Sequence, residues 1–376
     1  MRRTSVLAVL ALLGVFLLGI PGLGMAQDVV KLGAFLPMTG GVAAYGDMEW
    51  SGIQIAHDME PTVLGKKIDV VLVDTKSDKI EAANAVSLLV EKEKVAGILG
   101  EAISGNSMAG NPISEAAKIP SVSPTATNPL VTQGKMFAFR ACFIDPFQGE
   151  VAARFAWNEL KAKTAALIID QAQDYCVGLA NYFEKEFVKL GGKIVSKTYI
   201  QTGDQDFSAQ LSAVQAAKPD IIYAPNYYTE DALLAKQARD LGIKLPILTG
   251  DGAQDETLIK VGGASVENMY FTGHFHKQAA TTERAKEYIK RYEEKYKKEA
   301  GAFDALGADA YFLMVDAIKR AGSTDGAKIR EALADTKNFQ GVSGTITMGE
   351  GGNPIKSMVI NKVEGGKFVY VCTVTP

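Results

Sequence analysis

Hydroxyl-bearing side chains follow two short apolar runs in the first half of the chain. Ser104 comes after the run that ends at Leu99, at what we expect to be the N-cap of a helix. Its hydroxyl, the unpaired amides of the first helical turn and the helix dipole would suit a carboxylate. Thr125 and Thr127 follow the next apolar run, and their side chains point the same way if that segment is extended. Each motif alone fits an ordinary cap or loop, but together they predict a receptor for an anion.

A second set of residues, in the later part of the chain, suits a cation. Asp251 stands between two glycines after a short apolar run, and Tyr227 follows another such run. A carboxylate attracts an ammonium group, and a tyrosine can stack on the same cation or donate to a ligand oxygen. An aspartate between glycines is also a common turn residue. An anion receptor in one half and a cation receptor in the other predict that a zwitterion binds between the two halves.

The sequence offers little for catalysis or metal binding. Its three histidines are His57, His274 and His276, and none is adjacent to a cysteine or to a plausible nucleophilic serine. His274 and His276 alone are too few ligands for a metal site, and no phosphate-binding glycine loop is present. We therefore predict a protein without catalytic residues, metal or cofactor. Hydrolysis by Ser104 or Ser107 stays as a less favoured alternative, because no general base is identifiable.

Alternating strand and helix patterns place these motifs in a fold. Near-continuous apolar runs indicate strands covered on both faces, and longer amphipathic runs between them indicate helices. Strands are predicted at 29–36, 68–73 and 95–99, and helices at 45–60, 80–93 and 105–118. The alternation restarts after 145–149, with strands at 165–169, 194–200, 221–224 and 247–248. This βαβ repetition predicts mostly parallel sheets flanked by helices, with ligands bound at the carboxyl ends of the strands.

The last hundred residues differ in pattern. A charged helix is predicted at 283–299 and a second helix at 308–321. Strands at 358–363 and 367–374 flank Glu364-Gly365-Gly366, which predicts a hairpin. A length of 376 residues exceeds what one hydrophobic core usually serves, so we expect two domains. The net charge of −3 does not favour binding to nucleic acid.

The N-terminus has the features of an export signal. Arg2 and Arg3 precede an uncharged apolar run at 6–20, and helix-breaking and small residues follow it. This layout predicts a secretory signal peptide at 1–26 that is cleaved before Gln27, and therefore a periplasmic protein. An uncleaved membrane anchor is the alternative, but the apolar run is short for a spanning helix.

Three cysteines lie beyond the predicted signal peptide. They are Cys142, Cys176 and Cys372, and their odd number leaves at least one thiol free or paired with another molecule. A disulfide between Cys142 and Cys176 is compatible with an oxidising compartment. Isolated buried thiols fit the sequence at least as well, because bridging depends on spatial geometry.

Several motifs, in this order and spacing, resemble the periplasmic leucine/isoleucine/valine-binding proteins of branched-chain amino acid ABC transporters. The resemblance covers essentially the whole chain after residue 26. Its motifs lie at 31–40, 45–46, 100–107, 123–127, 145–149, 175–180 and 250–252. It implies a two-lobed type I periplasmic binding protein fold with three hinge crossovers, near 143–147, 271–276 and 344–354. Lobe 1 would comprise residues 27–143 and 275–345, and lobe 2 residues 144–272 and 354–376.

The resemblance also implies a function and a set of ligand contacts. The protein would capture a branched-chain or similar amino acid by hinge closure and deliver it to an ABC transporter permease in the inner membrane. It would act as a monomer, without enzymatic activity and without nucleic acid. The ligand carboxylate would be held by Ser104, Thr125 and Thr127, and its ammonium by Tyr227 and Asp251. The cleft near the ligand would be lined by Tyr45, Tyr175, Ala102, Ile103 and Phe303.

Two departures from the family pattern concern the cleft. Asp251 stands where the best-known members carry glutamate, and Cys176 follows the cleft tyrosine. Aspartate keeps the charge but shortens its reach by one methylene, so the sequence does not define the preferred ligand side chain. A sensor or receptor of the same fold, for an amide, urea-like or aromatic acid ligand, remains an alternative.

Overall fold

Apolar strands from the first part of the chain form a six-stranded sheet in the order β2-β3-β1-β4-β5-β6. The computed structural model describes residues 29–376, so the predicted signal peptide lies outside the described residues. The strands are β1 (Val29–Leu36), β2 (Thr62–Val63), β3 (Lys66–Asp74), β4 (Gly97–Gly100), β5 (Ser121–Ser123) and β6 (Ala138–Arg140). All neighbours are parallel except β2 and β3, as the βαβ pattern predicts.

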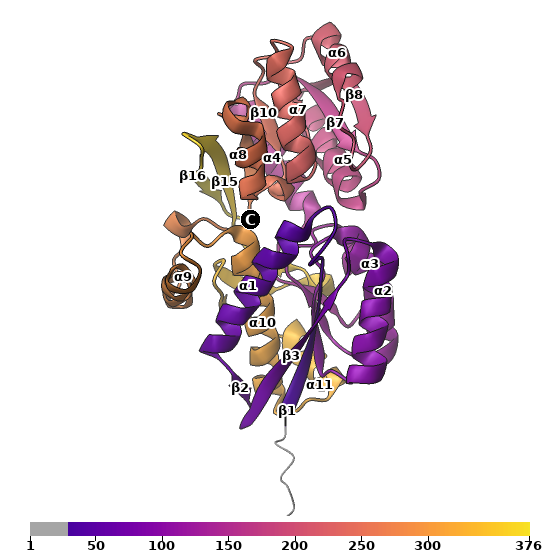
Figure 1. The fold of residues 1–376 in the computed structure, drawn as a ribbon, viewed down its shortest axis with the longest axis vertical. Coiled ribbons are helices and arrows are strands. Elements are labelled where there is room, and N and C mark those ends of the chain that lie inside the picture. Colours follow the sequence, from indigo (N-terminus) through magenta and orange to yellow (C-terminus); the bar gives the residue numbers. More distant parts are fainter. Residues whose placement is uncertain (1–28) are drawn as a thin grey trace, which may run out of the picture.

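Helices cover both faces of this first sheet. Figure 1 shows α2 and α3 on one face, and α1 and α10 on the other. The helices of this lobe are α1 (Ala43–Met59), α2 (Lys79–Ser87), η1 (Leu88–Glu93), α3 (Ser104–Ala117), η2 (Pro129–Val131), α9 (Glu283–Tyr296), α10 (Ala302–Ala321) and α11 (Gly326–Ala334). Across residues 29–376, no helix has both the length and the apolar character needed to span a bilayer.

A second, seven-stranded sheet has the order β16-β15-β11-β10-β9-β7-β8. Its strands are β7 (Thr164–Asp170), β8 (Lys193–Ile200), β9 (Ile221–Tyr223), β10 (Ile247–Thr249), β11 (Tyr270–Gly273), β15 (Met358–Glu364) and β16 (Lys367–Val374). Strands β7 to β11 pair in parallel, whereas β15 joins β11 and β16 in antiparallel fashion. Gly365 and Gly366 both have positive φ in the turn between β15 and β16, which confirms the predicted hairpin.

Helices and a small third sheet complete the second lobe and the region where the lobes join. The helices of the second lobe are α4 (Asp145–Asn158), α5 (Asp174–Lys189), α6 (Ser208–Ala217), α7 (Tyr228–Asp240), η3 (Asp251–Ala253), α8 (Glu256–Gly262) and η4 (Gly263–Val266). A small sheet contains β12 (Phe339–Gln340), β13 (Thr345–Met348) and β14 (Pro354–Ile355). The remaining short helices are η5 (Lys277–Ala279) and η6 (Glu350–Gly352).

The chain passes between the two main sheets at three places, after β6, after β11 and between β14 and β15. The third passage comes later than the expected 344–354. Strand β14 still pairs with β13, and Asn353 accepts a hydrogen bond at 3.0 Å from Thr132 of the first lobe. The buried ammonium of Lys356 donates to the Ala141 carbonyl at 3.2 Å and to the hydroxyl of Ser343. Lys356 therefore joins the first and third passages.

The helices α1 and α10 pack closely because a glycine removes a side chain at their contact. A Cβ atom on Gly52 would collide with the carbonyl oxygen of Asp304. The close approach brings Tyr45 of α1 against Phe303 of α10, with stacked rings whose centroids are 4.4 Å apart. This helix pair therefore carries two of the predicted cleft residues to one place.

We expect Gly52→Ala to lower the free energy of unfolding by about 2 kcal/mol, because the added methyl group forces the two helices apart. Chemical denaturation followed by circular dichroism measures the change. Gly41→Ala is the matched control, since a Cβ atom there would meet open space. Equal unfolding midpoints for the two variants would contradict the prediction.

Candidate ligand-binding site

A cavity lies between the lobes, where the carboxyl ends of parallel strands from both sheets face each other. Its lining residues are Tyr45, Ala102, Ser104, Thr125, Thr127, Tyr175, Tyr227, Asp251, Gly252 and Phe303. The structure therefore brings together every site residue predicted from the sequence except Ile103, which is buried but does not line the cavity. Gly252 is the one lining residue that the sequence analysis did not single out as a ligand contact.

On the first lobe, Ser104 begins the helix α3. The N-cap is Ile103 and not Ser104 as expected, so the serine is one residue inside the helix. The Ser104 hydroxyl accepts a hydrogen bond from the backbone N–H of Asn128 at 3.2 Å, which leaves its own proton free for a ligand. The Thr127 hydroxyl is buried and has no hydrogen-bond partner among residues 29–376. The amides of the first turn and these two hydroxyls thus offer donors to an anion.

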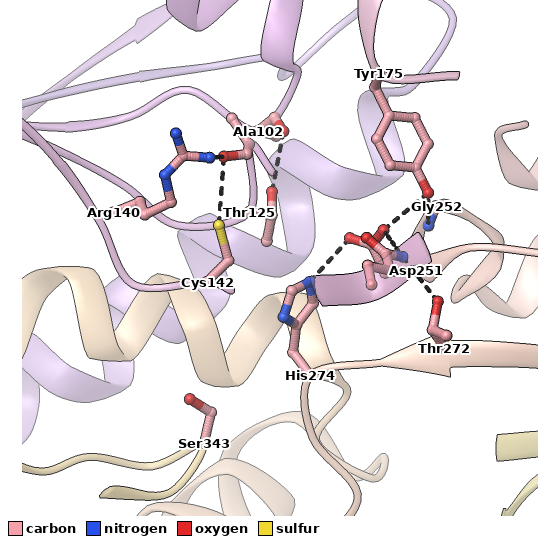
Figure 2. A network of polar contacts seen from close by, with 12 residues as sticks. Ala102, Thr125, Arg140, Cys142, Tyr175, Asp251, Gly252, Thr272, His274 and Ser343 are labelled. Carbon is pink, nitrogen blue, oxygen red and sulfur yellow. Dashed lines mark hydrogen bonds and ion pairs between the residues drawn. The ribbon is translucent and has the colours of Figure 1, made fainter. Parts of the chain in front are cut away.

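Thr125 lines the same cavity but uses its hydroxyl proton within the protein. Its Oγ1 atom lies 2.6 Å from Oε1 of Glu49 and 3.1 Å from the carbonyl oxygen of Ala102 (Figure 2 shows the second contact). Burial raises the pKa of Glu49 well above its ordinary value. Because a protonated Glu49 can donate to Oγ1 while the single Thr125 proton goes to the carbonyl oxygen of Ala102, the hydroxyl presents only a lone pair to the cavity. Thr125 therefore differs from Ser104 and Thr127 in what it can give to a carboxylate.

A buried carboxyl group, Glu101, shapes the segment that leads into α3. One of its oxygens accepts from the backbone N–H of Ile103 at 2.6 Å, and the other from Thr75 at 2.5 Å and Asn106 at 3.0 Å. Burial raises the pKa of Glu101 to about 7, against the effect of these donors. Because Glu101 occupies the N–H of Ile103, it helps to determine where the helix begins. The sequence analysis did not assign it a role.

A buried guanidinium braces the loop that carries Thr125 and Thr127. Arg140 is fully buried and donates to the carbonyl oxygens of Ala126 at 2.6 Å and Asn128 at 3.0 Å. Burial lowers its pKa, although the nearby Cys142 and Asp145 oppose that change. Its hydrogen bond to Ala126 is visible in Figure 2. Arg140 comes from β6, so its contact with this loop was not visible in the sequence.

On the second lobe, Asp251 is held by three donors, two of which, Tyr175 and His274, are labelled in Figure 2. Its Oδ1 atom accepts from Gln148 at 2.7 Å and from the Tyr175 hydroxyl at 2.8 Å, and its Oδ2 atom lies 2.9 Å from Nε2 of His274. Burial alone would raise the pKa of Asp251, but the interactions with His274, Gln148 and Tyr175 lower it below the ordinary aspartate value. Asp251 is therefore an ionised carboxylate on the wall of the cavity, as a cation receptor requires.

Aromatic rings form the rest of the wall. The rings of Tyr175 and Tyr227 are stacked with centroids 5.6 Å apart, and Tyr45 meets Tyr227 edge to face at 5.6 Å. The Tyr45 hydroxyl donates to the carbonyl oxygen of Gly252 on the opposite lobe. These rings provide apolar surface for a ligand side chain and exclude water from the charged groups.

Polar contacts at the rim hold the lobes together. Lys79 forms an ion pair with Asp174 at 2.7 Å, and Asn128 donates to the Asp174 carbonyl oxygen at 2.9 Å. The lysine and the asparagine belong to the first sheet's lobe, and Asp174 begins α5 of the other. The cleft is therefore closed over the cavity.

Ser107, one of the two serines considered for hydrolysis, is engaged elsewhere. The Ser107 hydroxyl donates to the backbone carbonyl of Glu101 at 3.0 Å and accepts from its N–H at 3.2 Å. No cluster of histidine, cysteine and acidic residues suited to a metal occurs within residues 29–376. All three cysteines are free, with Cys142 and Cys176 buried, so the structure contains no disulfide between them.

Comparison with known families identifies the chain. A family model described as periplasmic binding protein matches residues 29–367. The chain belongs to this family. It is 30% identical to the Leu/Ile/Val-binding protein BraC3 of Rhizobium johnstonii, over 92% of this chain and 94% of that protein. It is 28% identical to a leucine-, isoleucine-, valine-, threonine- and alanine-binding protein of Pseudomonas aeruginosa, over 89% and 90% of the two chains.

Solved structures of other periplasmic binding proteins have the same fold. A leucine-binding protein of Thermotoga maritima is 50% identical, with a TM-score of 0.91, and the match covers 92% of this chain and 99% of the other. A branched-chain amino acid transporter substrate-binding protein of Streptococcus pneumoniae, solved with isoleucine, is 33% identical with a TM-score of 0.87 over 93% and 100% of the chains. The two-lobed type I fold predicted from the sequence is confirmed by these similarities.

The buried Glu101 makes the stability of this binding protein depend on pH. Its pKa is about 7 in the fold and 4.5 in the reference state, so the folded protein holds more protons than the unfolded chain between these values. The free energy of unfolding therefore falls as pH rises from 4.5 to 7, by about 3 kcal/mol at most from this group. Denaturation curves at a series of pH values measure the slope.

Glu101→Gln should make this slope shallower, because the side chain no longer titrates. Glu91→Gln, at an exposed site on η1, is the matched control and should keep the slope of the native protein. An unchanged slope in Glu101→Gln would refute the assignment.

Proposed function

We propose that the protein captures a free amino acid, branched-chain or similar, between its lobes and delivers it to an ABC transporter permease. The observation that carries this proposal is one cavity lined by the ionised Asp251 of the second lobe and, from the first lobe, by the hydroxyls of Ser104 at the start of α3 and Thr127 on the loop after β5. A zwitterionic head group matches both walls at once. The relatives described above, which include leucine- and isoleucine-binding proteins, support the same ligand class.

In the proposed complex, each end of the ligand has its own receptor. The ammonium binds Asp251, and its neighbour Tyr227 contacts the same end. The carboxylate receives hydrogen bonds from Ser104, from Thr127 and from the first-turn amides of α3. Thr125 does not donate to the ligand carboxylate, because its proton is already used, and it can only accept from the ligand ammonium. The ligand side chain packs against Tyr45 and Phe303.

Selectivity for a zwitterion follows from the cost of leaving a buried polar group without a partner. A carboxylic acid without an ammonium would leave the carboxylate of Asp251 facing a group that cannot neutralise it, and an amine without a carboxylate would leave the donors of α3 unpaired. The site should therefore prefer amino acids to the amide, urea-like and aromatic acid ligands of the alternative hypothesis.

We further propose that closure is a rotation of the lobes about the three passages. In this proposal one lobe comprises residues 27–143 and 275–345, and the other residues 144–272 and 354–376; the pairing of β14 with β13 and the contact of Asn353 with Thr132 support assigning 346–355 to the first lobe. The ligand binds the first lobe, and the second lobe then closes over it and excludes water. The contacts of Asp174 with Lys79 and Asn128 belong to the closed form.

The cellular setting is part of the same proposal. The protein is exported by the signal peptide at 1–26, acts in the periplasm as a monomer and carries no cofactor. It binds its ligand without altering it, and nucleic acid is not a partner. The closed form is the one that the permease recognises in the membrane.

We expect L-leucine or L-isoleucine to raise the temperature of unfolding of the purified protein, since a ligand that binds only the folded state stabilises it. Differential scanning fluorimetry measures the shift, and calorimetry confirms the binding. Isopentylamine and 4-methylpentanoate are matched controls that each lack one charged group, and neither should shift the transition at the same concentration. A shift by 4-methylpentanoate as large as that by leucine would contradict a zwitterion site.

Asp251→Ala should weaken L-leucine binding by at least about tenfold, because the ammonium loses its counter-charge in a buried site. Isothermal titration calorimetry measures the affinity. Asp240→Ala, at an exposed position at the end of α7, is the control and should bind as the native protein does. If Asp251→Ala bound L-leucine with the native affinity, Asp251 would not be the receptor for the ammonium.

A further inference from the structure

We infer that His274 is a positioning residue for the ammonium receptor, and that a proton on His274 and a bound ammonium compete for Asp251. This inference rests on the proposed function of the site and extends it to a residue that does not line the cavity. His274 lies just after β11, where the chain begins its second passage between the lobes. Its side chain is fully buried and in contact with Asp251.

The hydrogen bonds around Asp251 determine where a cation can bind. Oδ1 already accepts from two donors, Gln148 and Tyr175, which occupy both of its lone-pair directions. Oδ2 accepts only from Nε2 of His274, at 2.9 Å. The remaining lone pair of Oδ2 is therefore the position for a ligand ammonium, next to the imidazole. His274 fixes the orientation of the oxygen that receives the ligand.

The same geometry defines the tautomer of His274. An ionised carboxylate has no proton to give, so Nε2 must carry the hydrogen and donate it to Oδ2. Nδ1 is buried and has no hydrogen-bond partner among the described residues, which suits an unprotonated nitrogen. The ring is stacked on Phe143 with centroids 3.8 Å apart, so it has little freedom to turn. Neutral His274 with the proton on Nε2 is the form that fits this site.

Protonation of Nδ1 would change the site in two ways. It would bury an N–H without an acceptor, and it would place a full positive charge beside Oδ2. An imidazolium would then neutralise Asp251 and repel the ligand ammonium only one carboxylate oxygen away. Because binding linkage is reciprocal, an ammonium bound at Asp251 must lower the pKa of His274 by the same free energy.

The groups that face His274 determine the pH range of this competition. Burial lowers the pKa of His274 below 6.5, the interactions with Asp251 oppose that change, and the charge of Lys356 adds to it. Cys142 stays a thiol, since its pKa is raised to about 12, and Asp145 stays protonated below its pKa of about 8. Asp251 stays ionised because its pKa is lowered. The contribution of His274 to affinity should therefore be constant at neutral pH and should fall as pH decreases through the pKa of His274.

The test compares two variants by calorimetry with L-leucine between pH 4.5 and 7.5. His274→Gln keeps an N–H donor for Oδ2 but cannot titrate, whereas His274→Leu removes the donor. At pH 7.5 we expect His274→Gln to bind within about threefold of the native protein, and His274→Leu to bind about tenfold or more weakly. The native protein should lose about fivefold or more of its affinity toward pH 4.5, and His274→Gln should lose clearly less.

His276→Gln is the matched control. His276 lies two residues further along, where Nδ1 accepts from the backbone N–H of Gln278 at 3.2 Å, a role that a glutamine oxygen can keep. This variant should retain both the native affinity at pH 7.5 and the native loss of affinity at low pH. The inference is overturned if His274→Leu binds as the native protein does, or if His274→Gln shows the full native pH dependence.

Nitrogen-15 NMR of the imidazole groups gives a readout that does not depend on the variants folding or on leucine being the ligand. In the ligand-free native protein we expect His274 to be the Nε2–H tautomer, with a pKa below 6.5. A charged His274 at pH 7, or the Nδ1–H tautomer, would overturn the inference. If leucine binds neither in calorimetry nor in thermal unfolding, the proposed function fails, and the NMR titration still decides the state of His274.

Discussion

An ionised carboxylate that is shielded from water must be surrounded by donors, or it becomes protonated. Asp251 meets this constraint with Gln148, Tyr175 and His274, which come from three different elements of the second lobe. Asp251 follows β10, His274 follows β11 and Tyr175 lies at the start of α5 after β7, so the carboxyl ends of these parallel strands bring them together. Gln148 joins them from the first turns of α4. The Oδ2 atom of Asp251 keeps an unused acceptor position, and Asp251 lines the cavity. The cation receptor thus exists before any ligand arrives.

Among the described residues, the first lobe offers a receptor for an anion without placing a positively charged side chain on the cavity wall. Its anion receptor consists of hydroxyls and backbone amides, so the nearby charged groups serve to hold the backbone in place. Glu101 holds the start of α3, and Arg140 holds the loop of Thr125 and Thr127. Both side chains are fully buried and form their hydrogen bonds with other groups of the protein. A carboxylate bound at this wall is therefore recognised by oriented dipoles, which discriminate by geometry as well as by charge.

Much of this architecture was readable from local sequence, because each strand and the polar cluster behind it are continuous segments. The alternation predicted both sheets, and the clusters after the strands predicted five of the residues that line the cavity. The family resemblance, and not the local pattern, added Tyr45, Ala102, Tyr175 and Phe303. The helix start at Ser104 was wrong by one residue, because the start depends on Glu101, whose side chain folds back onto the N–H of Ile103. The supporting residues were missed for a related reason: Gln148 and Asp251 are 103 positions apart, and no local pattern reports such a pair.

The position of the hinge explains how both receptors can survive opening of the cleft. Gln148 follows the first passage on α4, and His274 begins the second passage after β11, so in the proposed rotation the donors of Asp251 would move with the second lobe. Arg140 and Glu101 would move with the first. The two receptors would then separate without either one being broken, and the hydrogen bonds that open and close would be those between the lobes. Preorganised receptors lose little conformational entropy when the ligand binds. Closure of the lobes should therefore be stabilised mainly by the contacts that the ligand makes with both lobes at once.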